Sequence, residues 1–211
     1  MSDKNKVLVI VDMQNDFIDG SLGTKEAQGI VDKMVEYIKN FNGDIITTQD
    51  THYNDSDLNF NYFNTMEGKK LPVLHCVIGT DGWKINSKIE EACKENAEKN
   101  GTNYSTILKL TFGSDKLPEI INKGSRKNGQ YDEVYMCGVC TDICVVSNAL
   151  LLKADSPNRE MFILEDLCAG VTPEKHKSAL DVLQSCQCDV VKAFDKTLDK
   201  DNQILEDEME R

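Results

Sequence analysis

The run Lys6-Val-Leu-Val-Ile-Val11 decides the fold class of this chain, and Asp12 follows it directly. A short run rich in β-branched side chains is typical of a β-strand. Five similar runs come later in the chain and are also predicted as strands, at residues 44–49, 105–110, 132–139, 160–164 and 189–194. The sequence therefore predicts a sheet of about six strands.

Helical patterns separate these strands. Apolar residues recur at helical spacing from Ile30 to Phe41 and form one broad stripe, which predicts an amphipathic helix. Thr172 and Pro173 suit the N-cap and the first position of another helix. The later helices are predicted at residues 87–99, 115–123, 144–154 and 173–185. Because helical crossovers make strands parallel and cover both sheet faces, we expect an α/β fold: a three-layer α/β/α sandwich with a mostly parallel sheet.

The composition fits a globular protein that binds small molecules. Of the 211 residues, 40% are hydrophobic and 28% are charged. We expect one domain over residues 1–211, with its core at about 6–194 and a charged helix at about 195–211. The formal net charge of −12 opposes binding to nucleic acid and to anionic membranes, which are themselves polyanions.

The N-terminal residues lack the basic region, the long apolar stretch and the cleavage site of a signal peptide. No apolar run in the sequence approaches the roughly 18 residues of a membrane helix. We therefore expect a cytoplasmic location and no membrane partner. In that compartment the eight cysteines are expected to be free thiols, used for catalysis, metal binding or packing.

Polar side chains follow the first four predicted strands. Parallel sheets bind ligands beyond the carboxyl ends of their strands, so residues just past those ends converge. Asp12, Asp50, His52 and Cys144 follow predicted strands, and Lys109 lies near the end of the third. We expect an acid, a possible metal pair, a cation and a thiol at one edge of the sheet.

Cys144 is the candidate nucleophile. Its predicted position in the first turn of a helix favours the thiolate, because unpaired N–H groups and the helix dipole stabilise negative charge there. The N–H groups around Cys140 and Cys144 are placed to bind an oxyanion. A buried packing cysteine explains position 144 equally well, and Cys137, Cys140 and Cys144 also have a spacing found in metal sites. However, Cys137 falls inside a predicted strand. The six cysteines other than Cys140 and Cys144 are read as packing residues.

A candidate metal site surrounds the long segment from Thr51 to Lys84. Asp50 and His52 are two residues apart on an extended segment, and His75 returns from the loop, which makes a ligand set suited to zinc, manganese or iron. Glu67 is a further candidate ligand. Ordinary polar loop residues also explain this pattern, but two of only three histidines flank the loop. The third, His176, is expected to be exposed.

Together these residues resemble the isochorismatase-like cysteine hydrolases, and within them the nicotinamidase type. The similarity extends over roughly residues 6–194 in the family's order. The motifs that carry it are Val11-Asp12-Met-Gln-Asn-Asp-Phe17, Asp50-x-His52, His75-Cys-Val-Ile-Gly-Thr, Lys109 before Phe112-Gly, and Gly138-Val-Cys-Thr-Asp-Ile-Cys144.

The resemblance implies a cysteine hydrolase that converts nicotinamide to nicotinate and ammonia through a thioester. Its triad would be Asp12, Lys109 and Cys144. A cis peptide between Val139 and Cys140 would shape an oxyanion hole made by the N–H groups of Cys140 and Cys144, and Phe17, Val139 and Cys140 would line the substrate pocket.

The resemblance also implies a divalent metal ion held by Asp50, His52 and His75, with Glu67 as the further candidate. Zinc is the first choice, and manganese, iron and magnesium are alternatives. Homo-oligomers are common among similar proteins, so we expect one here.

Two departures from the family pattern affect the pocket. Cys140 replaces the more usual alanine, and the stretch before His75 lacks a tryptophan. The ring-stacking residue is therefore open among Trp83, Phe112 and Tyr104. Other functions also stay open: vinyl-ether hydrolysis of the isochorismatase type, hydrolysis of another small amide or carbamoyl compound, and a cysteine-based metal or redox sensor.

Overall fold

The computed structural model describes residues 4–54, 61–125 and 129–194. Within them one sheet has six strands in the order β3-β2-β1-β4-β5-β6, and every pair is parallel. The strands are β1 (Lys6–Val11), β2 (Asp44–Asp50), β3 (Tyr104–Lys109), β4 (Glu133–Val139), β5 (Glu160–Ala169) and β6 (Asp189–Val191). The predicted α/β fold with a parallel sheet is confirmed.

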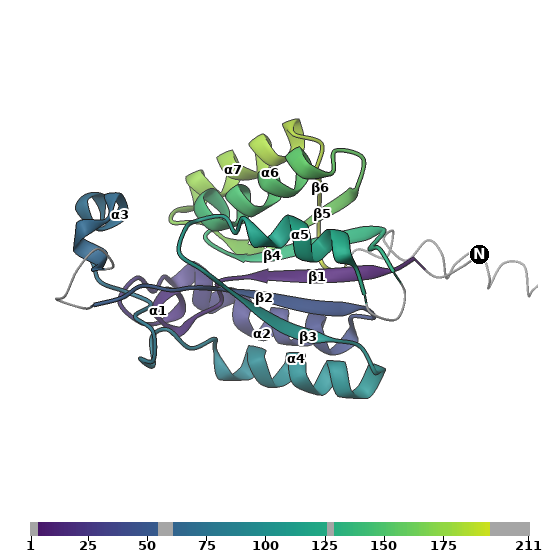
Figure 1. The fold of residues 1–211 in the computed structure, drawn as a ribbon, viewed down its shortest axis with the longest axis horizontal. Coiled ribbons are helices and arrows are strands. Elements are labelled where there is room, and N and C mark those ends of the chain that lie inside the picture. The colour runs from purple at the N-terminus through teal and green to yellow at the C-terminus, as the bar shows by residue number, and fades with distance from the viewer. Residues whose placement is uncertain (1–3, 55–60, 126–128, 195–211) are drawn as a thin grey trace, which may run out of the picture.

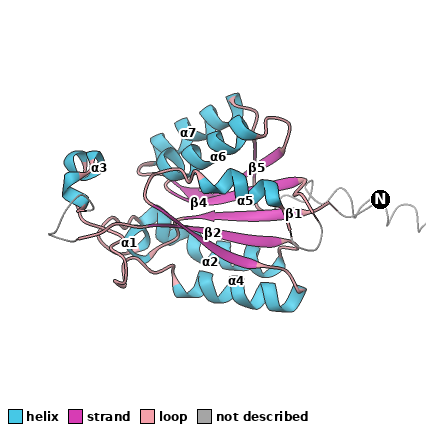
Figure 2. Cartoon of the chain, in the orientation of Figure 1, coloured by secondary structure: helices cyan, strands magenta, loops and turns pink. Residues whose placement is uncertain are grey.

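Helices cover both faces of the sheet. Figure 1 shows α2 and α4 on one face and α5, α6 and α7 on the other, and Figure 2 shows the three layers by element type. The helices are α1 (Asn15–Ile18), α2 (Lys25–Asn40), α3 (Met66–Lys70), α4 (Ser87–Asn100), α5 (Lys116–Lys123), α6 (Val146–Asp155) and α7 (Pro173–Ser185). Thr172 caps α7 by accepting from Lys175 N, as predicted.

The core lies between these layers. Residues 7–11 of β1 are fully buried because helices pack on both faces of the sheet. On α2 the predicted stripe faces the sheet: Met34 and Ile38 are fully buried, and Ile30 is nearly so. In the part of the chain described, no helix combines the length and the apolarity needed to cross a membrane.

Most boundaries lie within one residue of the predictions, and three differences are larger. β5 continues to Ala169, past the predicted end at residue 164, because an irregularity in its pairing with β4 accommodates the half-buried Glu165 and Asp166. β6 ends at Val191 rather than at residue 194. Before α6 the chain forms a π-helical turn, Thr141–Val145, so Cys144 is not in the first turn of an α-helix. The predicted helix at 195–211 lies outside the described residues.

Candidate active site

The strand order reverses between β1 and β4, and ligands bind at such a switch point in open α/β sheets. Asp12 follows β1 with a left-handed φ of 50°. Gly138, near the end of β4, has φ 119°, and a Cβ there would collide with the Val11 carbonyl oxygen. Only glycine lets β4 approach β1 this closely. The close approach brings the segment that carries Cys144 next to Asp12.

Lys109 connects the acid to the thiol. Its Nζ lies 2.6 Å from Asp12 Oδ2 and 3.6 Å from Cys144 Sγ. Thr48 Oγ1 donates to Asp12 Oδ1 at 2.7 Å, which holds the carboxylate on its other side. All three predicted triad residues are buried, with Lys109 only 3% exposed. The structure therefore brings together the three residues that sequence placed at three different strand ends.

Burial controls the protonation of this group. It raises the pKa of the Cys144 thiol well above its ordinary value; the charge on Asp12 adds to this and the charge on Lys109 opposes it. Burial likewise raises the pKa of Asp12. Burial by itself lowers the pKa of Lys109, but the neighbouring Asp12, Cys144 and Asp50 bring it well above its ordinary value. Burial therefore favours the neutral thiol, and the π-helical turn at Thr141–Val145 replaces the first turn of an α-helix in which Cys144 was expected.

The backbone turns sharply beside the thiol. The peptide bond between Val139 and Cys140 is cis, as the resemblance implies. The carbonyl of Cys140 accepts from the N–H groups of Ile143 and Val145, which closes the turn that carries Cys144. The Cys140 side chain is half-buried, and burial raises the pKa of its thiol to about 12.

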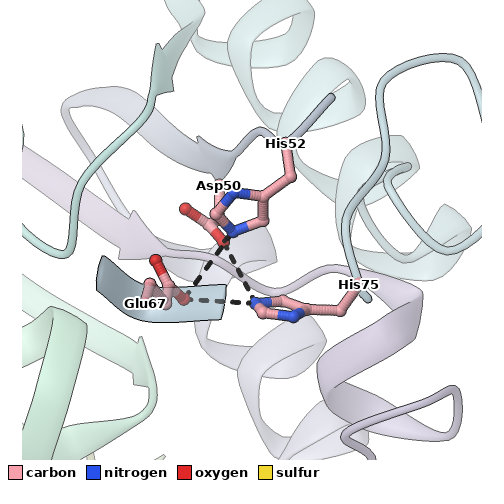
Figure 3. A group of neighbouring side chains, drawn as sticks. All are labelled: Asp50, His52, Glu67 and His75. Carbon is pink, nitrogen blue, oxygen red and sulfur yellow. Dashed lines mark ion pairs between the residues drawn. The ribbon is translucent and has the colours of Figure 1, made fainter. Parts of the chain in front are cut away.

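A second cluster lies next to the first (Figure 3), where the side chains of Asp50, His52, Glu67 and His75 point toward one another. His52 Nε2 lies 2.8 Å from Asp50 Oδ2 and 3.7 Å from Glu67 Oε1. His75 Nε2 lies 3.6 and 3.5 Å from the same two oxygens. Ligands about 2.0–2.2 Å from one ion lie roughly 3–3.5 Å apart, so these spacings suit a single ion.

Two further observations test this fit. His52 Nε2 is buried, and although Asp50 Oδ2 lies 2.8 Å away, it makes no hydrogen bond with the described residues, so this nitrogen is left to bind an ion. The Nδ1 of His75 lies 2.8 Å from the Val73 carbonyl oxygen and donates to it, which directs the Nε2 lone pair into the cluster. The four residues fit a divalent metal ion.

Hydrogen bonds of the backbone hold Asp50 and His52 in place. Asp50 ends β2, and its N–H donates to Gln14 Oε1 at 2.7 Å. His52 is held by backbone bonds on both sides, from its N–H to Cys76 O and from Ile78 N–H to its carbonyl. Glu67 lies on α3, which Figure 1 shows at the end of the molecule where the strands point.

Lys109 also joins the two clusters. Its Nζ lies 3.3 Å from Asp50 Oδ1, while Asp50 Oδ2 faces the two histidines. One ammonium group thus contacts the acid beside the thiol and a carboxylate of the metal cluster.

Sequence reasoning missed Tyr62. It is fully buried, and its ring meets those of His52 and His75 edge-on, at centroid distances of 4.7 and 5.3 Å. Its hydroxyl donates to the Leu71 carbonyl at 2.6 Å. The only signal in the sequence was an aromatic residue within the loop between the two histidines, without helical spacing.

Of the predicted pocket residues, Val139 is buried and Phe17 is half-buried with its ring 5.4 Å from that of His75. Trp83 is held beside the end of β2, because its Nε1 donates to Thr51 Oγ1 at 3.0 Å. Tyr104 begins β3 and therefore lies at the opposite edge of the sheet from Lys109, which removes it as a stacking candidate.

Two expectations outside the pocket are wrong. His176 is half-buried rather than exposed, and its Nδ1 lies 2.8 Å from Thr141 Oγ1, because α7 packs on the turn that carries Cys144. Cys186 is exposed, so it is not a packing residue.

Comparison with known proteins gives the family. The model of the isochorismatase domain matches residues 6–195. The nicotinamidase/pyrazinamidase of Mycobacterium tuberculosis is 26% identical over 198 residues, which cover 88% of this chain and 98% of that protein. The crystal structure of the Bacillus subtilis nicotinamidase/pyrazinamidase matches with a TM-score of 0.71 at 24% identity, and it covers 89% of this chain and 100% of that one.

A third relative was solved with a metal. The pyrazinamidase of Pyrococcus horikoshii in complex with zinc matches with a TM-score of 0.68 at 26% identity, over 89% of this chain and 99% of that one. Proteins named as nicotinamidases are among the relatives that the chain matches, and the chain itself belongs to the isochorismatase domain family.

Proposed function

We propose that the protein is a metal-assisted cysteine amidase that converts nicotinamide, or a small amide of similar shape, to the acid and ammonia. The observation that carries this proposal is the contact of one buried ammonium, Lys109 Nζ, with Asp12, Cys144 and Asp50. It puts an acid, a thiol and a metal-type cluster within reach of one small substrate. The names of the relatives support the choice of substrate.

In the first half of the reaction Asp12 takes the proton of the Cys144 thiol. The sulfur then attacks the amide carbon, and the carbonyl oxygen becomes an oxyanion that the N–H groups of Cys140 and Cys144 bind. When the carbon–nitrogen bond breaks, Asp12 passes its proton to the nitrogen, and ammonia leaves. A buried acid with a raised pKa suits both steps, since it must accept and return one proton.

In the second half Asp12 takes a proton from water, whose oxygen attacks the thioester carbon. The carbon–sulfur bond breaks, the sulfur is protonated again, and the carboxylic acid leaves. The role of Lys109 is electrostatic: its fixed positive charge stabilises the anionic sulfur and keeps the carboxylate of Asp12 directed toward it.

The cluster of Asp50, His52, Glu67 and His75 is proposed to hold the metal ion. Two imidazole nitrogens and two carboxylate oxygens favour zinc, manganese or iron over magnesium, which prefers oxygen ligands alone. When bound, the ion would supply a Lewis-acid contact that orients the ring nitrogen of a pyridine amide.

The alternatives fit the contacts less well. Vinyl-ether hydrolysis needs no thiol and leaves the contact between Lys109 and Cys144 without a use. For a sensor built on cysteines, Cys137 is fully buried within β4. In the described ranges the one group of three or more metal-ligating residues close enough to share an ion contains no cysteine.

Ammonia release tests the proposal. Purified protein is expected to release ammonia from nicotinamide, and a chelator is expected to slow this at least roughly tenfold, because substrate orientation is lost. Added zinc should restore the rate. Protein that is inert on nicotinamide and on a panel of small aromatic and aliphatic amides would rule out the proposed function. Turnover that a chelator leaves unchanged would contradict the role of the metal.

Metal binding by the chain can be measured without substrate. The substitution His52→Ala is expected to weaken zinc binding by roughly 100-fold or more, because it removes one of the ligands. The matched control is His176→Ala, which removes a half-buried histidine that is not part of the cluster. Calorimetry with zinc alone measures the zinc affinity of both variants. Zinc that survives His52→Ala but is lost in Cys137→Ala would favour the sensor instead.

A further inference from the structure

We propose that Asn148 is a positioning residue that holds Lys109 and Cys144 at working distance by joining the loop after β3 to the helix that follows the thiol. The inference deepens the proposed function and rests on it for the identity of the nucleophile. Asn148 lies on α6, one helical turn beyond Cys144, and its side chain is fully buried.

The side-chain amide of Asn148 makes hydrogen bonds in two directions. Within its own helix, Nδ2 donates to the Cys144 carbonyl at 2.8 Å. Across to the neighbouring loop, Nδ2 donates to the Phe112 carbonyl at 3.3 Å, and Oδ1 accepts from Ser114 N–H at 2.9 Å. Both ends of one planar amide are therefore used, and the loop is bonded at two points.

The loop and the helix also touch directly. A Cβ added to Gly113 would lie 2.6 Å from Leu151 Cδ1 and 3.3 Å from the Ser147 side chain. A larger residue at this position would require the end of the partly exposed Leu151 side chain to move, so the loop backbone packs closely on the helix here. The two hydrogen bonds from Asn148 to the loop lie on either side of Gly113, at Phe112 and Ser114. They therefore prevent the loop from sliding along the helix and from moving away from it.

The loop and the helix that Asn148 joins are continuous in the chain with Lys109 and Cys144, respectively. Lys109 is the last residue of β3, and the loop that reaches Ser114 follows it. On its other side the Lys109 carbonyl accepts from Thr51 N–H at 2.9 Å, so the strand end is held both by β2 and by the loop. The loop residues that Asn148 binds, Phe112 and Ser114, follow Lys109 closely in the chain, so a shift of the loop would move Lys109.

A shift of the loop would lengthen the contact between Lys109 and Cys144. At 3.6 Å, the distance from Lys109 Nζ to Cys144 Sγ has little margin, and a misplacement of about 1 Å can cost a reaction roughly 100-fold. The groups whose charges act on the thiol are Asp12, Lys109 and Asp50. Of these only Lys109 favours the thiolate, so moving Lys109 away makes the thiol harder to ionise.

Two substitutions separate the loop bonds from the helix bond. Asn148→Ala removes all three bonds. Asn148→Ser keeps a hydroxyl that can donate to the Cys144 carbonyl, as Ser147 donates to the Ile143 carbonyl at 2.6 Å, but is too short to reach the loop. The serine variant thus preserves the helix and tests the loop bonds alone.

The matched control is Asn96→Ala. Asn96 is also a buried asparagine, 2% exposed, whose Nδ2 donates to two carbonyls, those of Ile38 and Phe41. It lies on α4, on the opposite face of the sheet from α6. The two alanine variants are therefore expected to lose similar stability in urea unfolding while differing at the active site.

The main readout needs no substrate. Alkylation of Cys144 by iodoacetamide is followed against pH by mass spectrometry of its peptide, with the exposed Cys186 as internal reference for the reagent. Both Asn148 variants are expected to move the midpoint for Cys144 upward by about one pH unit, and to lower kcat for nicotinamide roughly tenfold or more with little change in KM. Asn96→Ala should leave both values at wild type.

Asn148 variants with the wild-type alkylation midpoint and kcat would overturn the inference and leave Asn148 a structural residue like Asn96. Wild-type protein that turns over none of the amides would instead defeat the proposed function, whereas the alkylation midpoints would still decide whether Asn148 positions Lys109 against the thiol.

Discussion

Alanine in place of Cys144 is expected to abolish ammonia release from nicotinamide, by at least roughly 10⁴-fold. The reason is chemical: without the sulfur no thioester forms, and Asp12 and Lys109 have no nucleophile to activate. Coupled measurement of ammonia under saturating substrate gives the residual rate.

Two cysteine variants serve as controls for this loss. Cys93→Ala removes another buried thiol, on α4, and a loss of about 1–2 kcal/mol of stability is expected for Cys93→Ala and for Cys144→Ala. Cys140→Ala leaves in place the backbone N–H proposed for the oxyanion hole, so it should retain activity. If Cys144→Ala kept more than about one hundredth of the wild-type rate, a thioester route would be excluded.

Methionine in place of Lys109 is expected to cost both activity and stability. Turnover should fall by roughly 10³-fold, because the charge that stabilises the anionic sulfur is lost. The free energy of unfolding should fall by about 3–5 kcal/mol, since Asp12 and Asp50 are buried and would lose the ammonium at 2.6 and 3.3 Å. Urea unfolding at neutral pH measures the second effect.

The control for Lys109→Met is the same substitution at Lys88, which forms an ion pair with an aspartate on the exposed surface. Lys88 Nζ lies 2.9 Å from Asp32, with side chains 65% and 85% exposed, so Lys88→Met should cost about 0–1 kcal/mol. Adding Asp12→Asn to Lys109→Met should recover part of the lost stability, because one unpaired buried charge is removed. Equal costs for Lys88→Met and Lys109→Met would mean that the buried charges are not held by Lys109.

Much of the site could be predicted because parallel strands end at one edge. Asp12 directly follows β1, and Asp50 and Lys109 are the last residues of β2 and β3, so their convergence follows from the fold alone. His75 has no such position, and it was identified by the scarcity of histidine and by the resemblance. The roles assigned to these residues stay predictions until the variants are measured.

Other features depend on contacts between distant segments. Asn148 and the Ser114 N–H are 34 residues apart, and His176 and Thr141 are 35 apart. A polar residue on a predicted helix face carries no sign of which loop it will meet. Tyr62 is similar, because its contact with both imidazoles exists only once the long loop has folded back.

The amino-acid sequence by itself determined the α/β fold and the edge of the sheet where the reactive residues gather, because alternating strand and helix patterns leave few ways to build a parallel sheet. The tertiary structure decided how far the reactive groups at that edge are shielded from water, and so the direction in which their pKa values shift. Helix position alone predicts a thiolate at Cys144, whereas burial in the folded chain favours the neutral thiol and raises the pKa of Asp12 beside it. Desolvation depends on everything packed around a group, and no local pattern in the sequence records it.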